Sequence, residues 1–209
     1  MPLPDLSDIE KNSEEIVRAI GHESVEVYRF LSDEFSRGSI LENFVFQFTY
    51  RSFYRLDSAG LTPEFKQKYF VLLEKARNQP DVDLTGIIRQ LFEFPNHRGH
   101  QSLQFSFSSK LANTVNPHYP IYDAEVAKVF GFRAPYNYKT FDVRLSEYLT
   151  FYTWLRDIYL EIINLGALQR PRELFRNIYA APPDWMPEIK VLDFIFWSAG
   201  KLSYEVNQA

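Results

Sequence analysis

Apolar residues recur every three to four positions along most of this chain of 209 residues. Leu145, Leu149 and Tyr152, for example, follow one another at the spacing that places side chains on one face of a helix. No segment alternates apolar and polar residues between hairpin turns, as a half-buried strand would, and no repeat of fixed period is visible. The pattern therefore predicts an all-α fold of about eight or nine helices.

The stretch from Leu41 to Leu56 is nearly continuous in aromatic and aliphatic residues. A helix that is apolar on most of its circumference has to be buried on several sides. We therefore expect this stretch to be the central scaffold helix. The longest helix is expected to begin after Thr140 and to run to about Asn164.

The segment from Ser106 to Phe130 reads SFSSKLANTVNPHYPIYDAEVAKVF and predicts a helix, a rigid turn and a second helix. Ser108 and Ser109 are placed to cap a first helix that begins at Lys110, because serine hydroxyls accept hydrogen bonds from the amides of a first helical turn. The first helix is expected to end where the chain reaches two prolines.

These prolines, Pro117 and Pro120, keep the backbone extended as far as Tyr122, since proline disfavours the helical conformation at the residue before it. Asp123 follows directly, at the N-cap position of the second helix, which ends near Phe130. One aspartate is thus expected to be held at a helix start by rigid flanking backbone.

The run PIYDAEVAKVF, residues 120–130, resembles the segment of helix-hairpin-helix DNA glycosylases in which a catalytic aspartate caps a helix after an extended stretch that contains proline. SKLAN, residues 109–113, is similar to the lysine-bearing helix start of the 8-oxoguanine glycosylase branch. Together with ENFVFQFTYRSFYRLDSAGLTPEFKQKYF, residues 42–70, these segments resemble small bacterial proteins grouped as 8-oxoguanine-glycosylase-like. The resemblance covers about a quarter of the chain.

The resemblance implies a single domain over residues 1–209, in which two sub-lobes of N-terminal and C-terminal helices lie around a cleft at residues 100–131. It implies that Asp123 is a catalytic carboxylate, which stabilises the sugar cation as the glycosidic bond breaks or activates a nucleophile. Lys110 then matches the family's nucleophile, an amine that attacks the anomeric carbon of the sugar and forms a Schiff base.

The stretch before Lys110 departs from the family pattern. The family normally carries a hairpin of the form Leu-Pro-Gly-Val-Gly there, whose backbone amides hold a DNA phosphate, whereas this chain reads NHRGHQSLQFSFSS and offers only Gly99 for a tight turn. The interval from Lys110 to Asp123 is also shorter than in the family. On the residue pattern alone, Asp123 is equally well an ordinary helix cap, and Lys110 a solvated or phosphate-binding lysine.

A glycosylase that flips its target base out of DNA needs a pocket with apolar walls and a few polar groups that read the base. Polar residues inside strongly apolar predicted helices are candidates for these groups and nearby aromatic residues for the walls, although a core role is the more common one for both. We predict as substrate-binding residues Phe44, Gln47, Phe48, Arg51, Tyr122, Asp193 and Trp197, and as DNA-binding residues Arg98, His100, Ser108, Ser109 and Lys128.

Two further clusters of polar residues have simple interpretations. Arg170, Arg172 and Arg176 would either contact phosphates or form a solvated basic face. His97 and His100 are three residues apart but have no acidic cluster beside them, so neither a metal nor another cofactor is expected.

The formal net charge of −4 argues against DNA binding. Residues 1–34 carry a balance of −6, however, which leaves the rest of the chain at +2 and compatible with a local positive face. The chain has no cysteine, which excludes thiol catalysis, zinc–thiolate sites and iron–sulfur clusters and fits a reducing compartment. Because no apolar run is long enough for a membrane span, we expect a soluble and cytoplasmic protein. We also expect a monomer.

These observations predict a DNA glycosylase that flips out and excises a damaged or modified base, with double-stranded DNA as its partner. Defence against phage DNA that carries modified bases is one use of this chemistry. The alternative is a non-catalytic helical module that binds DNA or protein and retains the glycosylase fold. The altered hairpin and the acidic net charge favour this alternative.

Overall fold

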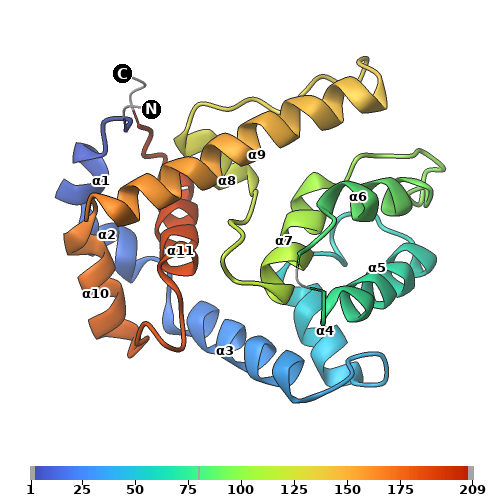
Figure 1. The fold of residues 1–209 in the computed structure, drawn as a ribbon, viewed down its shortest axis with the longest axis horizontal. Helices are drawn as coiled ribbons and strands as arrows, with labels where there is room; N and C mark the ends of the chain where they lie inside the picture. Colours follow the sequence, from blue (N-terminus) through green and yellow to red (C-terminus); the bar gives the residue numbers. More distant parts are fainter. Residues whose placement is uncertain (1–2, 80, 207–209) are drawn as a thin grey trace. The chain divides into compact units, whose positions relative to one another are not determined.

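The computed structural model describes residues 3–79 and 81–206, and the regular secondary structure in them is helical throughout (Figure 1). The prediction of an all-α fold is confirmed. The described residues form eleven helices, so the expected number of eight or nine was too low. Two of these helices, α1 (Ser7–Lys11) and α2 (Ser13–Arg18), are short and follow one another before Gly21.

The chain folds as two units. The terminal unit combines both ends of the chain, Met1–His22 and Pro117–Ala209, and the middle unit is Glu23–Asn116. Asp123 therefore belongs to the terminal unit and Lys110 to the middle unit.

Helix α11 (Glu188–Lys201) is the core of the terminal unit, and eleven of its fourteen residues are buried. It contacts α2, α8 (Ala124–Val129), α9 (Phe141–Asn164) and α10 (Gln169–Tyr179) (Figure 1). Small residues near its end allow α8 to approach closely, since a Cβ atom at Gly200 would overlap the carbonyl group of Glu125. Helix α11 is thus the scaffold on which the other helices of this unit rest.

Helix α9 is the longest helix of the described chain, as predicted. The side chain of Thr140 caps it by accepting a hydrogen bond from the amide of Val143, and the helix ends at Asn164. Neither α9 nor any other helix in the described ranges is long and apolar enough to cross a membrane.

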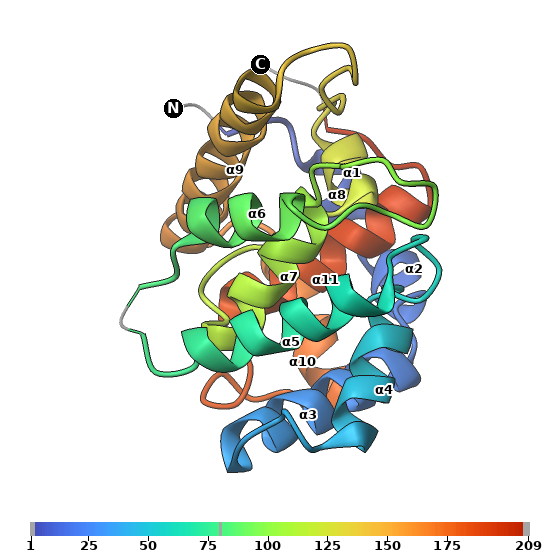
Figure 2. The ribbon, with the colours of Figure 1, turned by 90° about the vertical axis from the view of Figure 1, so that its right-hand side faces the viewer.

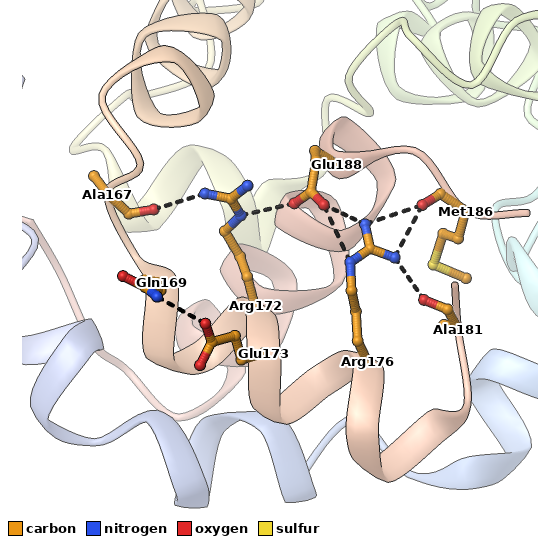
Figure 3. Close-up of polar contacts among 8 residues, drawn as sticks. All are labelled: Ala167, Gln169, Arg172, Glu173, Arg176, Ala181, Met186 and Glu188. Atoms are coloured by element: carbon orange, nitrogen blue, oxygen red, sulfur yellow. Dashed lines mark hydrogen bonds and ion pairs between the residues drawn. The ribbon is translucent and has the colours of Figure 1, made fainter. Parts of the chain in front are cut away.

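Two arginines of α10 hold the turn that leads into α11 (Figure 3). Arg172 and Arg176 both donate to the carboxylate of Glu188, Arg172 through Nε at 2.7 Å. Arg176 also donates to the backbone carbonyls of Ala181 and Met186. Partial burial raises the pKa of Glu188, but the hydrogen bonds and charges of the two arginines outweigh this effect and keep the pKa below its ordinary value. Arg172 and Arg176, two of the three arginines predicted to contact phosphates or solvent, therefore bind groups of the protein itself.

The middle unit contains most of α3 (His22–Arg37) together with α4 (Phe44–Phe53), α5 (Pro63–Ala76), α6 (Leu84–Phe92) and α7 (Phe105–Val115). Helices α5, α6 and α7 lie side by side (Figure 2). The core between α4, α5 and α7 is aromatic and hydrogen-bonded: the hydroxyl groups of Tyr50 and Tyr69 lie 2.9 Å apart, and Tyr69 donates to the carbonyl of Phe107. These bonds satisfy the polar atoms of two fully buried tyrosines.

Helix α4 is not the central scaffold helix, so the prediction for residues 41–56 was wrong. Only Phe46 and Tyr50 of its ten residues are buried, and they face Phe70 of α5. Phe44 and Phe48 lie on the other side and are 75% and 64% exposed. The apolar pattern runs around the helix, but the fold covers only one of its faces.

Candidate functional site

Asp123 lies at the N-terminus of α8, as predicted. Its backbone is extended, with φ −131° and ψ 153°, and its carboxylate accepts a hydrogen bond from the amide of Glu125 at 3.2 Å. The side chain is half-buried, whereas Val126 and Val129 on the inner face of α8 are fully buried. The amide of Glu125 therefore fixes the position of the carboxylate at the start of the helix.

Side chains from α9 and α11 hold the backbone that precedes Asp123. The hydroxyl of Tyr152 in α9 donates to the carbonyl of Pro120 at 2.7 Å, and the amide of Ile121 donates to Oδ1 of Asp193 in α11 at 2.9 Å. The ring of Tyr122 then packs edge-on against Tyr148, with centroids 5.2 Å apart. Three successive residues are thus tied to the unit before the chain reaches Asp123.

Asp193, which we predicted to bind substrate, is only 4% exposed. Burial raises the pKa of its carboxyl group to about 7, although the ammonium group of Lys190, 3.8 Å from Oδ2, favours the ionised form. Oδ1 accepts a hydrogen bond from the backbone amide of Ile121, and the carboxylate also interacts with Tyr159 of α9. The contacts of Asp193 with Ile121 and Lys190 therefore hold the fold together and involve no substrate.

Lys110 is not a solvated lysine, because its side chain is only 8% exposed. Its Nζ atom donates to the hydroxyl of Ser106 at 3.0 Å and lies 5.4 and 5.9 Å from the ring centroids of Phe107 and Tyr54. An amine among aromatic faces keeps a favourable electrostatic environment while it loses most of its water. The alternative that Lys110 is a solvated surface lysine is therefore excluded.

The expected capping role of Ser108 and Ser109 was wrong. Helix α7 begins at Phe105, with Gln104 as its N-cap residue, so both serines lie in its second turn and are fully buried. Their hydroxyl groups donate to backbone carbonyls of the preceding turn, those of Gln104 and Ser106. Neither serine offers a surface hydroxyl to DNA in this position.

Residues 96–100 form a tight turn before α7. Gly99 has a φ of +76°, and its amide donates to the carbonyl of Asn96. The side-chain oxygen of Asn96 accepts from the amides of both Arg98 and His100, at 2.9 and 3.1 Å. The side-chain oxygen of Asn96 therefore engages two backbone N–H groups of the turn, while the side chains of Arg98 and His100 remain exposed.

Three predicted substrate-binding residues line one hollow on the middle unit. Phe44, Gln47 and Arg51 recur along one side of α4 and line the hollow together with residues of α5. The hollow has a volume of about 580 Å³. Phe48, which was predicted with them, does not line it. The other predicted members of the set, Tyr122, Asp193 and Trp197, belong to the terminal unit.

Lys128 and Trp197 take up structural contacts around the end of α11. Nζ of Lys128 donates to the carbonyl of Gly200 at 3.3 Å and to the hydroxyl of Ser203 at 3.0 Å, although the residue as a whole is exposed. Trp197 is half-buried, and Nζ of Lys201 lies 4.4 Å from its ring. Lysine at a helix C-terminus complements the carbonyl groups that lack an intrahelical partner.

Sequence reasoning missed Tyr152, Lys190 and Asn96. In the sequence, Tyr152 resembles the other core aromatic residues of α9, and no neighbouring residue indicates its hydrogen bond to Pro120. Lys190 and Asp193 are three residues apart in a strongly apolar helix, and this spacing does indicate a pair on one face. Asn96, three residues before a glycine, is likewise a usable signal, because asparagine side chains often bond the backbone just after them.

Comparisons of this chain with protein-family models, with curated proteins and with solved structures find no match. The described residues also contain no group of three or more histidine, aspartate and glutamate side chains placed to hold a metal ion. What the fold and the sites define is an all-helical protein of two units, with a capping aspartate in one and a buried lysine in the other.

Proposed function

We propose that the protein is a DNA glycosylase that flips out a damaged or modified base and cleaves its N-glycosidic bond. The observation that carries the proposal is the setting of Asp123, a half-buried carboxylate at a helix start whose preceding backbone is held by α9 and α11. The resemblance of residues 109–130 to the glycosylase segments supports the same assignment.

In this reaction the bond between C1′ of the sugar and the base nitrogen breaks, and positive charge develops on the sugar. The carboxylate of Asp123 stabilises this charge, and because its position is fixed beforehand, no reorganisation is needed during the reaction. The base leaves with the electron pair of the bond.

Lys110 supports a second step. In its unprotonated form Nζ attacks C1′, and the resulting adduct opens to a Schiff base, from which elimination of the 3′ phosphate cuts the strand. The burial of Lys110 among aromatic rings fits a nucleophile better than a solvated surface lysine. Excision of modified bases from phage DNA is one use of this chemistry.

A base-release assay on duplexes that each carry one modified base, 8-oxoguanine among them, tests the proposal. We expect release by the parent protein and a loss on the order of 10²-fold or more in Asp123→Asn. Asp83→Asn is the matched control, because Asp83 caps α6 in the same way, through a bond from the amide of Gly86. A loss in both variants would indicate an effect on folding only.

Borohydride trapping tests the lysine separately. We expect a covalent adduct between DNA and the parent protein, and none with Lys110→Gln. The exposed Lys75→Gln is the control that leaves the adduct intact. Release of the base without an adduct would leave Asp123 in its role and remove Lys110 from the nucleophilic one.

The second candidate is a helical DNA-binding module without catalysis. Asn96 favours it, because its side chain occupies two amides of the turn that corresponds to the family's phosphate-binding hairpin. Binding of DNA by the parent without release of any base in the panel would select this candidate.

A further inference from the structure

The outer face of α4 and the bend before it form an exposed apolar surface. Leu41, Phe44, Val45 and Phe48 lie within eight residues of the chain and are 42%, 75%, 66% and 64% exposed. The other exposed large apolar residues of the described chain are spread over several elements. A cluster of this kind usually marks a surface that another molecule covers.

The α4–α5 hollow lies directly beside this face, and Leu41 and Phe44 belong to both. Its walls are one side of α4 and the facing side of α5, with an apolar end at Phe70 and Val71. Its full lining is Leu41, Phe44, Gln47, Arg51, Asp57, Pro63, Lys66, Gln67, Phe70 and Val71. Projecting side chains and a hollow that can receive side chains therefore occur on the same surface.

The charges along this surface are of opposite sign at its two ends. Glu42 lies exposed just before α4 and has no ion pair within the described residues. At the other end Arg51 and Lys66 share a single carboxylate, that of Asp57, at 3.2 and 2.7 Å, which leaves one positive charge in excess. Burial raises the pKa of Asp57, but the hydrogen bonds and charges of Lys66 and Arg51 together outweigh it and keep the pKa below its ordinary value.

We propose that this surface joins two copies of the chain about a twofold axis, with the two α4 helices antiparallel. A twofold contact requires a self-complementary surface, and here each copy has both the projecting Val45 and Phe48 and the hollow that receives them. An antiparallel arrangement also brings Glu42 of one copy to Arg51 and Lys66 of the other, twice. An amphipathic helix laid in an apolar groove is a common mode of recognition.

The charge pattern is what selects a second copy as the partner. A helix that is negative at its start and positive at its end is complementary to itself only when reversed, and the twofold axis supplies this reversal. The inference does not depend on the proposed enzymatic activity, and it replaces the expectation of a monomer.

Sedimentation over a wide range of protein concentration tests the interface. We expect a dimer of the parent chain and a dissociation constant about thirtyfold or more higher in Phe48→Glu, because a central aromatic anchor is replaced by a charge. Leu165→Glu is the matched control, since Leu165 is 65% exposed at the end of α9 and the change in net charge is the same. We expect this control to remain dimeric.

Charge exchange tests the antiparallel arrangement. Glu42→Arg and Arg51→Glu should each raise the dissociation constant by about tenfold, and the double variant should recover most of the loss. A thermal melt of each variant checks that its monomer is folded. If Phe48→Glu proves to be unfolded, the dissociation constants of the charge variants test the interface instead. A parent chain that is monomeric at all concentrations, a Phe48→Glu chain that stays dimeric, or losses that add in the double variant would each overturn the proposal. The first result would assign the surface to a different molecule.

Discussion

Helices α4 and α11 are alike in apolar content and opposite in their surroundings. Apolar residues make up more than half of each helix and occur around most of its circumference. Yet α11 buries eleven of its fourteen residues and α4 only two of ten. Apolar content therefore indicates that a helix can be buried and says little about how many neighbours the fold supplies.

The residues that distinguish the two helices are the small and the polar ones. Ser198, Ala199 and Gly200 lie together in α11, and the absence of a side chain at Gly200 lets the backbone of α8 come close. Polar groups of α11 are buried with partners, as when Ser198 donates to the carbonyl of Ile16 at 2.6 Å. In α4 the polar Gln47 is half-buried and bonds only the local carbonyls of Ile40 and Leu41.

Removal of one phenylalanine ring from each helix should give the largest contrast in stability. Phe196 is fully buried between Phe130 and Tyr159, with ring centroids 4.8 and 5.3 Å away, so Phe196→Ala should lower the free energy of unfolding by about 3–5 kcal/mol. Phe48→Ala should change it by less than about 0.5 kcal/mol, because the exposed ring loses little on removal.

Urea unfolding at a protein concentration low enough to keep the chain monomeric measures both values. Equal losses in the two variants would mean that α4 is covered in solution even in the monomer, and the contrast between the helices would disappear.

The pH dependence of stability should differ between two carboxylates of α11. Burial raises the pKa of Asp193 to about 7, compared with about 3.9 for an unfolded aspartate. The folded state then binds more protons than the unfolded state between these values, so this residue lowers stability as the pH rises from about 4 to about 7. For Glu188 the sign is reversed, because its lowered pKa adds stability above about 4.3 that is lost in acid.

Asp193→Asn tests this assignment, since an amide still accepts the bond from Ile121 but does not titrate. The difference in unfolding free energy between variant and parent should grow in favour of the variant from pH 4.5 to pH 7.5, by at most about 1.4 kcal/mol per pH unit. Parallel curves for the two proteins would mean that Lys190 holds Asp193 ionised throughout this range.

The parts of the fold that could be predicted from the sequence are those that depend on local contacts. Asp123 and Thr140 are N-caps because their own side chains bond amides two and three residues further along. The start of α7 was misplaced, because its N-cap residue Gln104 makes no side-chain cap bond, whereas the two serines inside the helix resemble caps. A cap that is absent leaves no local signal.

The supports of the candidate site could not be predicted in the same way. The bond from Ile121 to Asp193 joins residues 72 positions apart, and that from Tyr152 to Pro120 joins residues 32 apart. Nothing in a single sequence marks these residues as partners. The pattern therefore identified Asp123 as a cap after a stretch kept rigid by prolines, and gave no information on the side chains of α9 and α11 that hold this stretch.

The smallest expected effect on stability concerns the start of α4. This helix is stabilised there by side-chain hydrogen bonds of Asn43, whereas α11 is stabilised by packing. Asn43 accepts from the amide of Phe46 at 3.0 Å and donates to Glu34 at 2.8 Å, whereas Pro187 before α11 makes no side-chain cap bond. Asn43→Ala should therefore lower the free energy of unfolding by about 1 kcal/mol, and Asn43→Asp by less, because aspartate retains the acceptor. Urea unfolding of both variants measures the difference. If Asn43→Ala had no effect, the exposed helix would have to be stabilised by a covered face, as α11 is, and the distinction between the two helices would be one of degree.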